Sequence, residues 1–407
     1  MESLERCIET RAGDFTERGC SFLGCRVVVC GQINNVVHLV HSPIGCAYYS
    51  WDYRMDARGY CFTTDMDEMD IVFGGEEKLL KAILKAIDEF NPDAVFVYET
   101  CSTGIIGDDI QAIAKKAYEL TNVPVIAFQC AGFRGRSQNF GHKIACTSIF
   151  RFINNENRKP IPNSVNLIGD FNKKDSKILE KLLNEVGIRV LCTFTANATI
   201  EKIRNMVNAE LNLVMCSKSS AFLAELMEES FGIPYLEVNF FGFENCCNSL
   251  YRISEYLDAN VERVVEDASW IKMVTDKYRE KLEGKRVFIC HGAQRAVYWI
   301  KPFEELGMKV AGIATHFGIE LSDFDGLVVD NISSDELEEL IAKLSPDLIV
   351  SDDKVRHIAH KMAVPFFNGR GQNTGYAGFE GFLNFAKDVV GIFDQKIWRL
   401  TRYDFSL

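Results

Sequence analysis

The sequence predicts an α/β protein made of three Rossmann-like, doubly wound domains with parallel sheets. Short apolar, β-branched runs alternate with amphipathic helical segments along nearly the whole chain. A polar stretch with two prolines at residues 155–163 interrupts this alternation, and a long charged segment interrupts it again at residues 249–284. With 407 residues and 47% hydrophobic content, the chain is long enough for several such cores.

The first predicted domain, residues 1–155, begins with a short charged helix or arm and contains the clearest amphipathic helix. Leu79, Ile83 and Ile87 recur at helical spacing within residues 76–90. A second helix is expected to end near residue 120. Apolar runs predict strands at residues 26–30, 36–40, 94–98 and 123–130.

The other two predicted domains repeat this alternation. In the second, residues 156–255, the expected strands are 164–171, 189–194 and 211–217, and the expected helices are 175–186, 199–208 and 219–231. The third, residues 256–407, includes most of a connecting helix predicted over 249–284. Its expected strands are 285–292, 309–315, 325–330, 347–353 and 364–371.

Composition excludes several classes of function. The net charge of −12 is opposite to the basic footprint of a nucleic-acid-binding protein. No apolar run approaches the roughly 20 residues of a membrane span, and the charged first residues are unlike a secretory signal. We therefore expect a cytoplasmic protein whose 14 cysteines serve metal binding, redox chemistry or packing. The sequence contains neither a Walker A motif nor a GxSxG motif.

Three cysteines stand in glycine-flanked settings that suit a shared metal cluster. Cys101 follows the strand AVFVY, Cys20 lies in RGCSFLG, and Cys46 lies in SPIGCAYYS. Glycine allows backbone and thiolate to approach a bulky ligand closely. Taken alone, each cysteine is more often a small buried apolar residue, and it is the three together that favour a cluster. Iron–sulfur clusters usually need four ligands, so either another cysteine joins these three or a partner chain completes the site.

Further candidate residues lie elsewhere in the chain. Cys216 ends the strand LNLVMCS and could be either a ligand or a buried residue. Gln138 and His142 lie in a glycine-rich loop, where the histidine could act as a neutral donor or be structural. Four arginines occupy polar or glycine-rich loops after strands and could hold anions or form surface ion pairs: Arg54, Arg134, Arg295 and Arg370. The remaining cysteines mostly fall in apolar runs and are predicted to pack in cores: Cys7, Cys25, Cys30, Cys61, Cys130, Cys146, Cys192, Cys246, Cys247 and Cys290.

Taken in order, these motifs resemble the α-type subunits of the nitrogenase component 1 superfamily. The resemblance runs nearly end to end, from RGCSFLGC to GYAGFEGFLNFAKD. It implies that Cys20, Cys46 and Cys101 ligate the α half of a P-type iron–sulfur cluster, 8Fe-7S or 4Fe-4S, shared with a β-type subunit in an α2β2 assembly. It also implies an ATP-dependent iron protein as electron donor and a small-molecule substrate.

The same resemblance assigns residues to a nitrogenase-type iron–sulfur cofactor whose heterometal the sequence leaves open. Cys216 matches the family's cofactor cysteine. Gln138 and His142 match a glutamine and a histidine that overhang the cofactor. The remaining matches are a substrate-gating valine, an arginine near it and an arginine of a glycine-rich cofactor-facing loop, here Val28, Arg54 and Arg295.

One departure from the family affects the expected activity. The family's second cofactor ligand is a histidine, but the corresponding stretch here is Asn-Gly-Arg-Gly with Arg370. Arginine stays protonated and is not an ordinary metal ligand. We therefore expect a nitrogenase-like reductase that acts on something other than dinitrogen, for example of the methylthio-alkane type.

The resemblance also leaves two alternatives. One is a scaffold for cofactor assembly, which the string HLVHSPIGC and the following SWDYR resemble. Scaffolds of the family generally carry asparagine at the place of His142, which favours the reductase. The other is a tetrapyrrole reductase, which the retained Cys216 disfavours.

Overall fold

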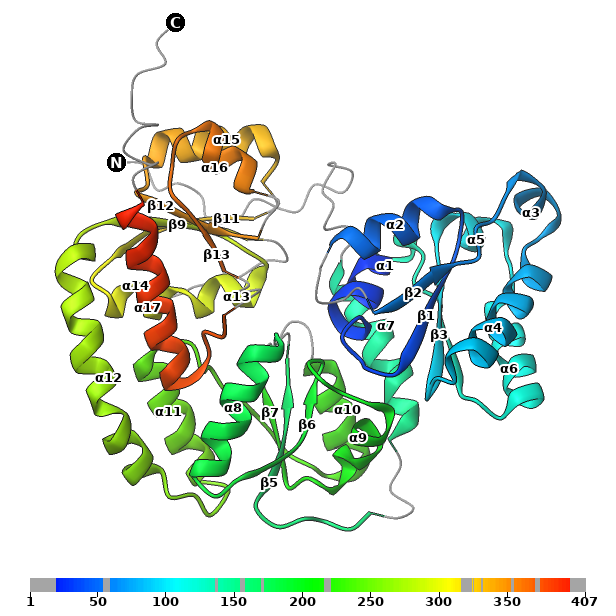
Figure 1. Cartoon of the computed structure of the whole chain (residues 1–407), viewed down its shortest axis with the longest axis horizontal. Coiled ribbons are helices and arrows are strands. Elements are labelled where there is room, and N and C mark those ends of the chain that lie inside the picture. Colours follow the sequence, from blue (N-terminus) through cyan, green and yellow to red (C-terminus); the bar gives the residue numbers. More distant parts are fainter. Residues whose placement is uncertain are drawn as a thin grey trace, which may run out of the picture. The chain divides into compact units, whose positions relative to one another are not determined.

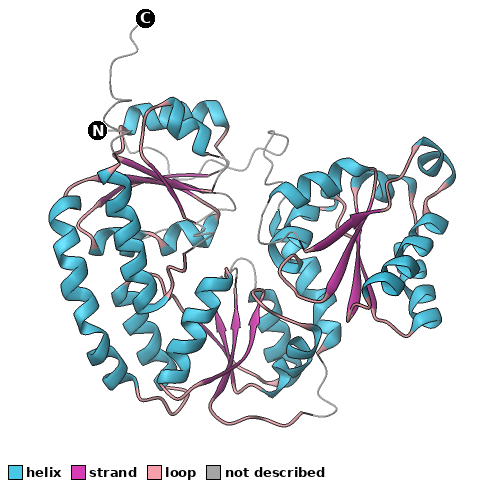
Figure 2. Cartoon of the chain, viewed as in Figure 1, coloured by secondary structure: helices cyan, strands magenta, loops and turns pink. Residues whose placement is uncertain are grey.

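The structure, a computed structural model, contains three parallel β-sheets and confirms the predicted fold class. It describes residues 20–53, 59–135, 138–153, 158–169, 172–215, 221–315, 324, 326–330, 332–352, 355–369 and 374–395. The strand orders are β2-β1-β3-β4, β6-β5-β7-β8 and β11-β10-β9-β12-β13, and neighbouring strands in each sheet pair in parallel. Strands and helices alternate along the chain, as Figure 2 shows.

The described residues divide into two compact units. The thiol unit lies within Glu17–Phe171 and Arg189–Glu237, and the C-terminal unit lies within Asn172–Ile188 and Val238–Leu407. The first two sheets belong to the thiol unit and the third to the C-terminal unit. The residue boundaries of the three predicted domains remain a prediction.

Helices cover both faces of the first sheet (Figure 1). On one face, Leu79 and Ile83 of one helix and Ile110 of another pack against the strands in one buried core. The expected helix over 76–90 forms with those bounds. The strands of this sheet are β1 Val36–His41, β2 Tyr60–Thr63, β3 Ala94–Glu99 and β4 Val125–Phe128. Its helices are α1 Ser21–Leu23, η2 Gly24–Cys30, α2 Ile44–Tyr53, α3 Glu68–Phe73, α4 Glu76–Phe90, α5 Cys101–Ile106, α6 Ile110–Thr121, η4 Gly132–Arg134, α7 Gln138–Ile149 and η5 Phe150–Phe152.

The predicted strand at residues 26–30 is wrong, because η2 is a π-helix. All of its residues are buried, as the apolar run indicated. A Cβ on Gly24 would lie 2.0 Å from the carbonyl oxygen of Gln138, and one on Gly141 would lie 2.0 Å from that of Ser21. These two glycines let this segment pack backbone to backbone against α7, and that packing outweighs the β preference of the valines.

The second sheet follows the predicted order of strands and helices. Its strands are β5 Ser164–Ile168, β6 Arg189–Phe194, β7 Leu211–Val214 and β8 Tyr235–Glu237. The helices within the thiol unit are α9 Ile200–Asn205, η6 Met206–Asn208 and α10 Ala221–Phe231. The short edge strands β2 and β8 were not predicted, because neither has a long apolar run.

The C-terminal unit contains the third sheet and the longest helices. The predicted helix over 249–284 is in fact two helices, α11 Phe243–Ser254 and α12 Val261–Leu282. Between them, the N–H of Asn260 donates to the carbonyl of Val186 in α8's C-cap, so the chain leaves the helical path there. The strands are β9 Arg286–Cys290, β10 Lys309–Thr315, β11 Leu327–Asp330, β12 Leu348–Ser351 and β13 Phe366–Asn368. The other helices are α8 Lys173–Glu185, α13 Ala293–Tyr298, α14 Ile300–Glu305, α15 Ser334–Leu344, α16 Arg356–Lys361 and α17 Gly378–Asp394.

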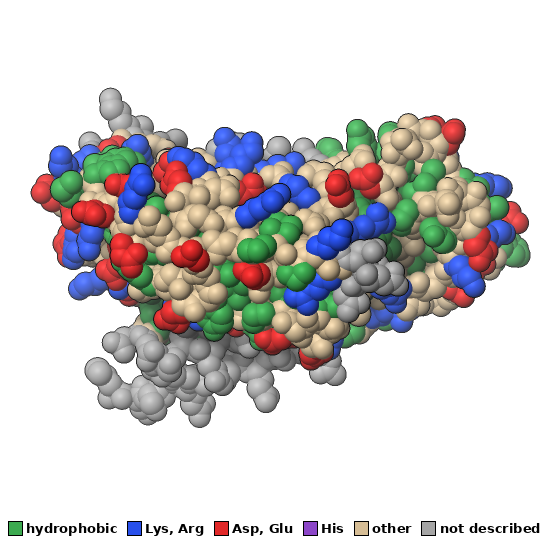
Figure 3. Space-filling model, turned by 90° about the horizontal axis from the view of Figure 1, so that it is seen from below, with side chains coloured by type: hydrophobic (Ala, Val, Ile, Leu, Met, Phe, Trp, Pro, Cys, Tyr) green, Lys and Arg blue, Asp and Glu red, His purple; other side chains and the backbone are tan. Residues whose placement is uncertain are grey.

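The surface is charged with both signs. On the face shown in Figure 3, Lys and Arg side chains are interspersed with Asp and Glu side chains. Among the described residues, none of the helices combines the length and the apolar character that crossing a membrane requires.

Candidate functional site

Three cysteines lie at the beginnings of helices in the thiol unit. Cys46 is in the first turn of α2, which follows β1, and Cys101 is the first residue of α5, which follows β3. Cys20 is the N-cap of α1. Because β1 and β3 are adjacent and parallel, their carboxyl ends meet at one edge of the sheet. The sequence prediction that Cys101 is delivered at such an edge is therefore confirmed for its position.

Two of these thiols converge on Gly132. A Cβ at Gly132 would lie 3.1 Å from Sγ of Cys101 and 3.2 Å from Sγ of Cys20. Burial raises the pKa of Cys46, and the nearby Cys101 and Cys20 raise it further. Burial also raises the pKa of Cys20, while hydrogen bonds from the Leu23 and Phe22 N–H groups lower it. The three thiols therefore affect one another electrostatically, and a cation would be needed to ionise them together.

This arrangement fits an iron–sulfur cluster better than a single ion. Among the residues that the structure describes, no three His, Cys, Asp or Glu side chains surround one metal position. A cluster distributes its cysteine ligands over several irons, so they need not surround one point. The glycine at position 132 leaves both thiols the space that a side chain would fill. Positive helix N-termini also favour an anionic group at this edge.

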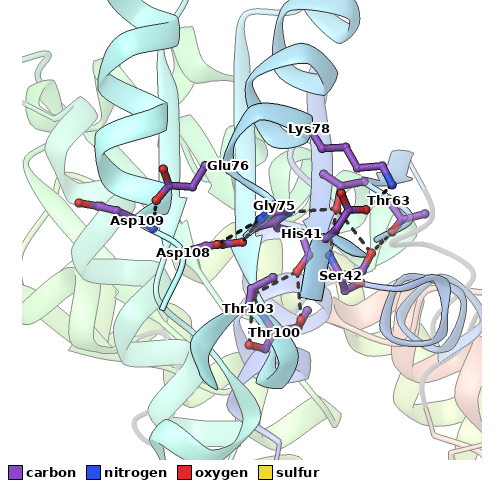
Figure 4. Close-up of polar contacts among 12 residues, drawn as sticks. His41, Ser42, Thr63, Gly75, Glu76, Lys78, Thr100, Thr103, Asp108 and Asp109 are labelled. Carbon is purple, nitrogen blue, oxygen red and sulfur yellow. Dashed lines mark hydrogen bonds and ion pairs between the residues drawn. The ribbon is translucent and has the colours of Figure 1, made fainter. Parts of the chain in front are cut away.

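A buried polar network holds the carboxyl edge of the sheet (Figure 4). His41, at the end of β1, places Nε2 2.9 Å from Oδ2 of Asp108 and Nδ1 3.0 Å from the hydroxyl of Thr64. Asp108 also accepts from the N–H of Gly75 at 3.0 Å. Burial lowers the pKa of His41, and Asp108 offsets part of that effect. The neutral imidazole then carries its proton on Nε2 and accepts from the threonine hydroxyl.

The same network fixes the start of the Cys101 helix. The hydroxyls of Thr100 and Thr103 donate to the carbonyl of His41 at 3.0 and 3.2 Å. Thr100 also caps α5, because Thr103 accepts from its N–H at 3.0 Å. The end of β1, which leads to Cys46, is thus tied to the residue before Cys101. Sequence reasoning did not identify this network, since its members come from four separated segments.

Gln138 and His142 lie on a helix, so their predicted placement in a loop is wrong. Both are in α7, four residues apart and therefore on one face, and their exposed fractions are 7% and 6%. Gly141, which suggested a loop, instead permits the close contact of α7 with the preceding buried helices. Val28 is buried on η2, which packs against α7. The structure thus places these three residues on two packed elements of the thiol unit.

The remaining candidates are distributed differently. Arg295 is half-buried on α13 of the C-terminal unit, near the buried Asp175. Burial raises the pKa of Asp175, and Arg295 counteracts that rise. Cys216, Arg54 and Arg370 lie outside the described residues.

The cysteines predicted to pack in cores are mostly buried where the structure describes them. Cys61 and Cys247 are half-buried. Those that are fully buried are Cys25, Cys30, Cys130, Cys146, Cys192, Cys246 and Cys290. Cys7 lies outside the described residues.

Known proteins resemble this chain over almost its whole length. The family of nitrogenase component 1 type oxidoreductases matches residues 20–394. The chain belongs to the nitrogenase component 1 family. Its α-type character agrees with the nitrogenase molybdenum-iron protein alpha chain of Methanothermococcus thermolithotrophicus, which is 36% identical over 97% of this chain and 90% of that protein.

Other nitrogenase component 1 relatives have a different role in their names. The nitrogenase iron-molybdenum cofactor biosynthesis protein NifE of Methanococcus maripaludis is also 36% identical, over 98% of this chain and 88% of that protein. Among solved structures, nitrogenase Cp1 at pH 6.5 superposes with a TM-score of 0.88 at 30% identity, covering 97% of this chain and 92% of the other. The family implies iron–sulfur clusters and a metallocofactor, and it includes both kinds of α-type chain.

Proposed function

We propose that this chain is the α-type subunit of a cytoplasmic, nitrogenase-like metalloreductase. Its electron donor is an ATP-dependent iron protein, and its substrate is a small molecule other than dinitrogen. The observation that carries the proposal is the meeting of Cys20, Cys46 and Cys101 at one sheet edge, each at a helix start. We assign to these thiols the α half of a P-type cluster.

A partner chain completes this site in our proposal. Three thiols leave an iron–sulfur cluster short of its usual ligands. Large apolar side chains are exposed on the Cys46 and Cys101 helices and on the turn beside the thiols: Ile44 at 60%, Tyr48 at 64%, Ile105 at 76% and Phe133 at 54%. Exposed apolar groups around an incomplete ligand set favour coverage by another protein. We assign this surface to the homologous β-type subunit of an α2β2 assembly.

A second cluster, the nitrogenase-type cofactor, would supply multi-electron reduction of a bound substrate when present. In this proposal Cys216 holds the cofactor, and Arg54, Arg295 and Arg370 balance its negative charge. His142 holds and delivers a proton at an imidazole nitrogen, with Gln138 beside it on the same helix face. Val28 shapes the approach of the substrate. Arg370, in place of the family's histidine, supports a substrate other than dinitrogen.

A scaffold for cofactor assembly is the second candidate. The specific observation in its favour is that NifE proteins are as similar to this chain as the nitrogenase alpha chains are. A scaffold holds a precursor and passes it on, and it has no need of a proton donor. His142, where scaffolds of the family generally carry asparagine, favours the reductase.

The His142→Gln variant tests the assignment. The anaerobically purified complex with its β-type chain is supplied with the iron protein and ATP, and turnover is measured beside metal content. We expect the variant to retain its iron but to lose most turnover, because glutamine cannot exchange a proton near neutral pH. The matched control is Lys143→Gln, which changes an exposed neighbour on α7.

Two outcomes would contradict this proposal, one its proton-delivery role and the other the reductase assignment. Equal turnover in His142→Gln, with intact metal content, would remove the proton-delivery role. A wild-type complex that shows no turnover but transfers its cofactor to an apo-nitrogenase would identify a scaffold.

A further inference from the structure

A short turn, residues 131–134, lies beside two of the three thiols. We call it the floor turn. Among described atoms outside its chain neighbours, only the sulfurs of Cys20 and Cys101 lie within 4 Å of a Cβ built on Gly132. The hydroxyl of Ser21, next to Cys20, donates to the first carbonyl of the floor turn at 2.9 Å. The position of this turn therefore determines the space in which these two thiols stand.

A buried carboxylate holds the floor turn in place. Glu99 is the last residue of β3, two positions before Cys101, and only 2% of it is exposed. Its Oε2 accepts from the N–H of Ala131 at 3.1 Å. Arg134 donates to both carboxylate oxygens, through Nε at 2.5 Å and Nη2 at 2.6 Å. Both ends of the turn are therefore attached to one carboxylate.

The packing around this ion pair leaves little freedom to rearrange. Gly104 of α5 lies directly over it, and a Cβ there would be 3.2 Å from Oε1 of Glu99 and 3.0 Å from Cβ of Ala131. The side chain of Arg134 is partly exposed, with an exposed fraction of 37%, whereas the side chain of Glu99 has an exposed fraction of 3%. A two-pronged Arg–carboxylate pair defines direction as well as distance, which a lysine cannot do.

We propose that Glu99 and Arg134 are positioning residues of the thiol site. They fix the floor turn and thereby the positions of Cys20 and Cys101 relative to each other. Arg134 also adds a fixed positive charge beside the thiol site, whose cysteines become anionic when they ligate a cluster. The inference rests on the proposed function where it concerns a bound cluster, but its geometric part concerns the thiols alone.

The test uses Arg134→Gln, Arg134→Lys and Glu99→Gln in the full chain, with Lys85→Gln as a control that breaks an exposed ion pair of the same unit. The metal-free proteins are alkylated anaerobically with iodoacetamide, and each thiol is followed by peptide mass spectrometry. We expect Cys20 to react about tenfold faster in Arg134→Gln, because a charge-assisted bond is lost and the turn opens more often. Cys46, whose sulfur is not within 4 Å of a Cβ built on Gly132, is expected to be unchanged.

A second measurement follows the midpoint potential of the cluster in the reconstituted complex with the β-type chain. Arg134→Gln is expected to shift the potential to more negative values, since a positive charge favours the reduced, more anionic cluster. Arg134→Lys keeps the positive charge but not the two-pronged hydrogen bonding to Glu99. It should therefore have the midpoint potential of the wild type, while its Cys20 should be alkylated as fast as in Arg134→Gln. A purely structural contribution to folding would not separate these two effects.

Either of two results would overturn the inference. One is alkylation of Cys20 and Cys46 accelerated equally or not at all in every variant. The other is a midpoint potential that changes neither when the positive charge of Arg134 is removed nor when its two-pronged hydrogen bonding is lost. If the wild-type complex binds no cluster, the proposed function fails, but the alkylation rates still decide whether the pair positions the thiols. If Arg134→Gln does not fold, Arg134→Lys supplies the alkylation comparison.

Discussion

Gly132→Ala is the substitution that tests the thiol site most selectively. The added methyl group would stand 3.1 Å from one sulfur and 3.2 Å from the other. Non-bonded heavy atoms prefer to be about 3.5–4.0 Å apart. Each of the two sulfurs must therefore move away from the added methyl group by roughly 0.5 Å. Metal–ligand distances tolerate about 0.2 Å. The displacement therefore exceeds what cluster ligation accepts.

The expected cost in folding is much smaller than the cost in metal binding. Gly132 is not among the residues with positive φ, so alanine adds no backbone strain. Overpacking costs about 1–3 kcal/mol, and the reduced entropy of the unfolded chain returns about 0.4–1 kcal/mol. We expect a net destabilisation of about 0–2.6 kcal/mol, with most of the cluster iron lost.

The assay compares iron and labile sulfide per chain with the free energy of unfolding, both measured anaerobically in the complex with the β-type chain. Gly45→Ala is the matched control, because a Cβ there meets nothing within 4 Å although it adjoins Cys46. Gly132→Ala with the same iron content as Gly45→Ala would refute the reasoning that Gly132 gives the thiols their space.

Two further predictions concern stability. Gly141→Ala places a Cβ 2.0 Å from the backbone oxygen of Ser21 and should destabilise the thiol unit by about 3 kcal/mol or more in denaturant unfolding. The control Gly391→Ala, whose Cβ meets nothing within 4 Å, should be neutral or slightly stabilising. Equal effects of the two substitutions would contradict the tight packing at Gly141. Burial raises the pKa of Glu305 from 4.5 to about 7. Between these pH values the folded chain keeps a proton on Glu305 that the unfolded chain loses. The free energy of unfolding should therefore fall by up to about 3 kcal/mol as the pH rises from 4.5 to about 7. Glu305→Gln should flatten this part of the pH profile of unfolding, and an unchanged slope would exclude Glu305 as its source.

Except for the short edge strands β2 and β8, the strands were predictable because most of them are continuous apolar runs that alternate with helical segments along the chain. The helix over 76–90 was predictable to the residue, since its apolar stripe, acidic start and Asn91 cap leave no competing structure. The π-helix of residues 24–30 was not predictable, because its cause lies in Gly24 and Gly141, which are far apart in sequence. Local preference could not reveal a contact between two backbones.

The candidate site shows the same division. Cys101 could be singled out because it follows a buried strand, where parallel sheets place their ligands, and Cys46 because of its glycine-flanked setting. The contribution of Gly132 and Glu99 was hidden, since a glycine in a glycine-rich loop and an acid at a strand end are common features. Only the fold brings Gly132 against two sulfurs and attaches Glu99 to the turn that carries it.

The central claim is that Cys20, Cys46 and Cys101 hold an iron–sulfur cluster together with a partner chain. The most direct measurement is iron and labile sulfide in the anaerobically purified protein, alone and co-expressed with its β-type chain, for the wild type and for alanine variants of these cysteines. Cys246→Ala, which changes a buried cysteine of the C-terminal unit, is the control. The account predicts a cluster that depends on the partner and is lost in each of the three variants but not in the control. A full complement of iron in the variants, or equal loss in the control, would contradict it.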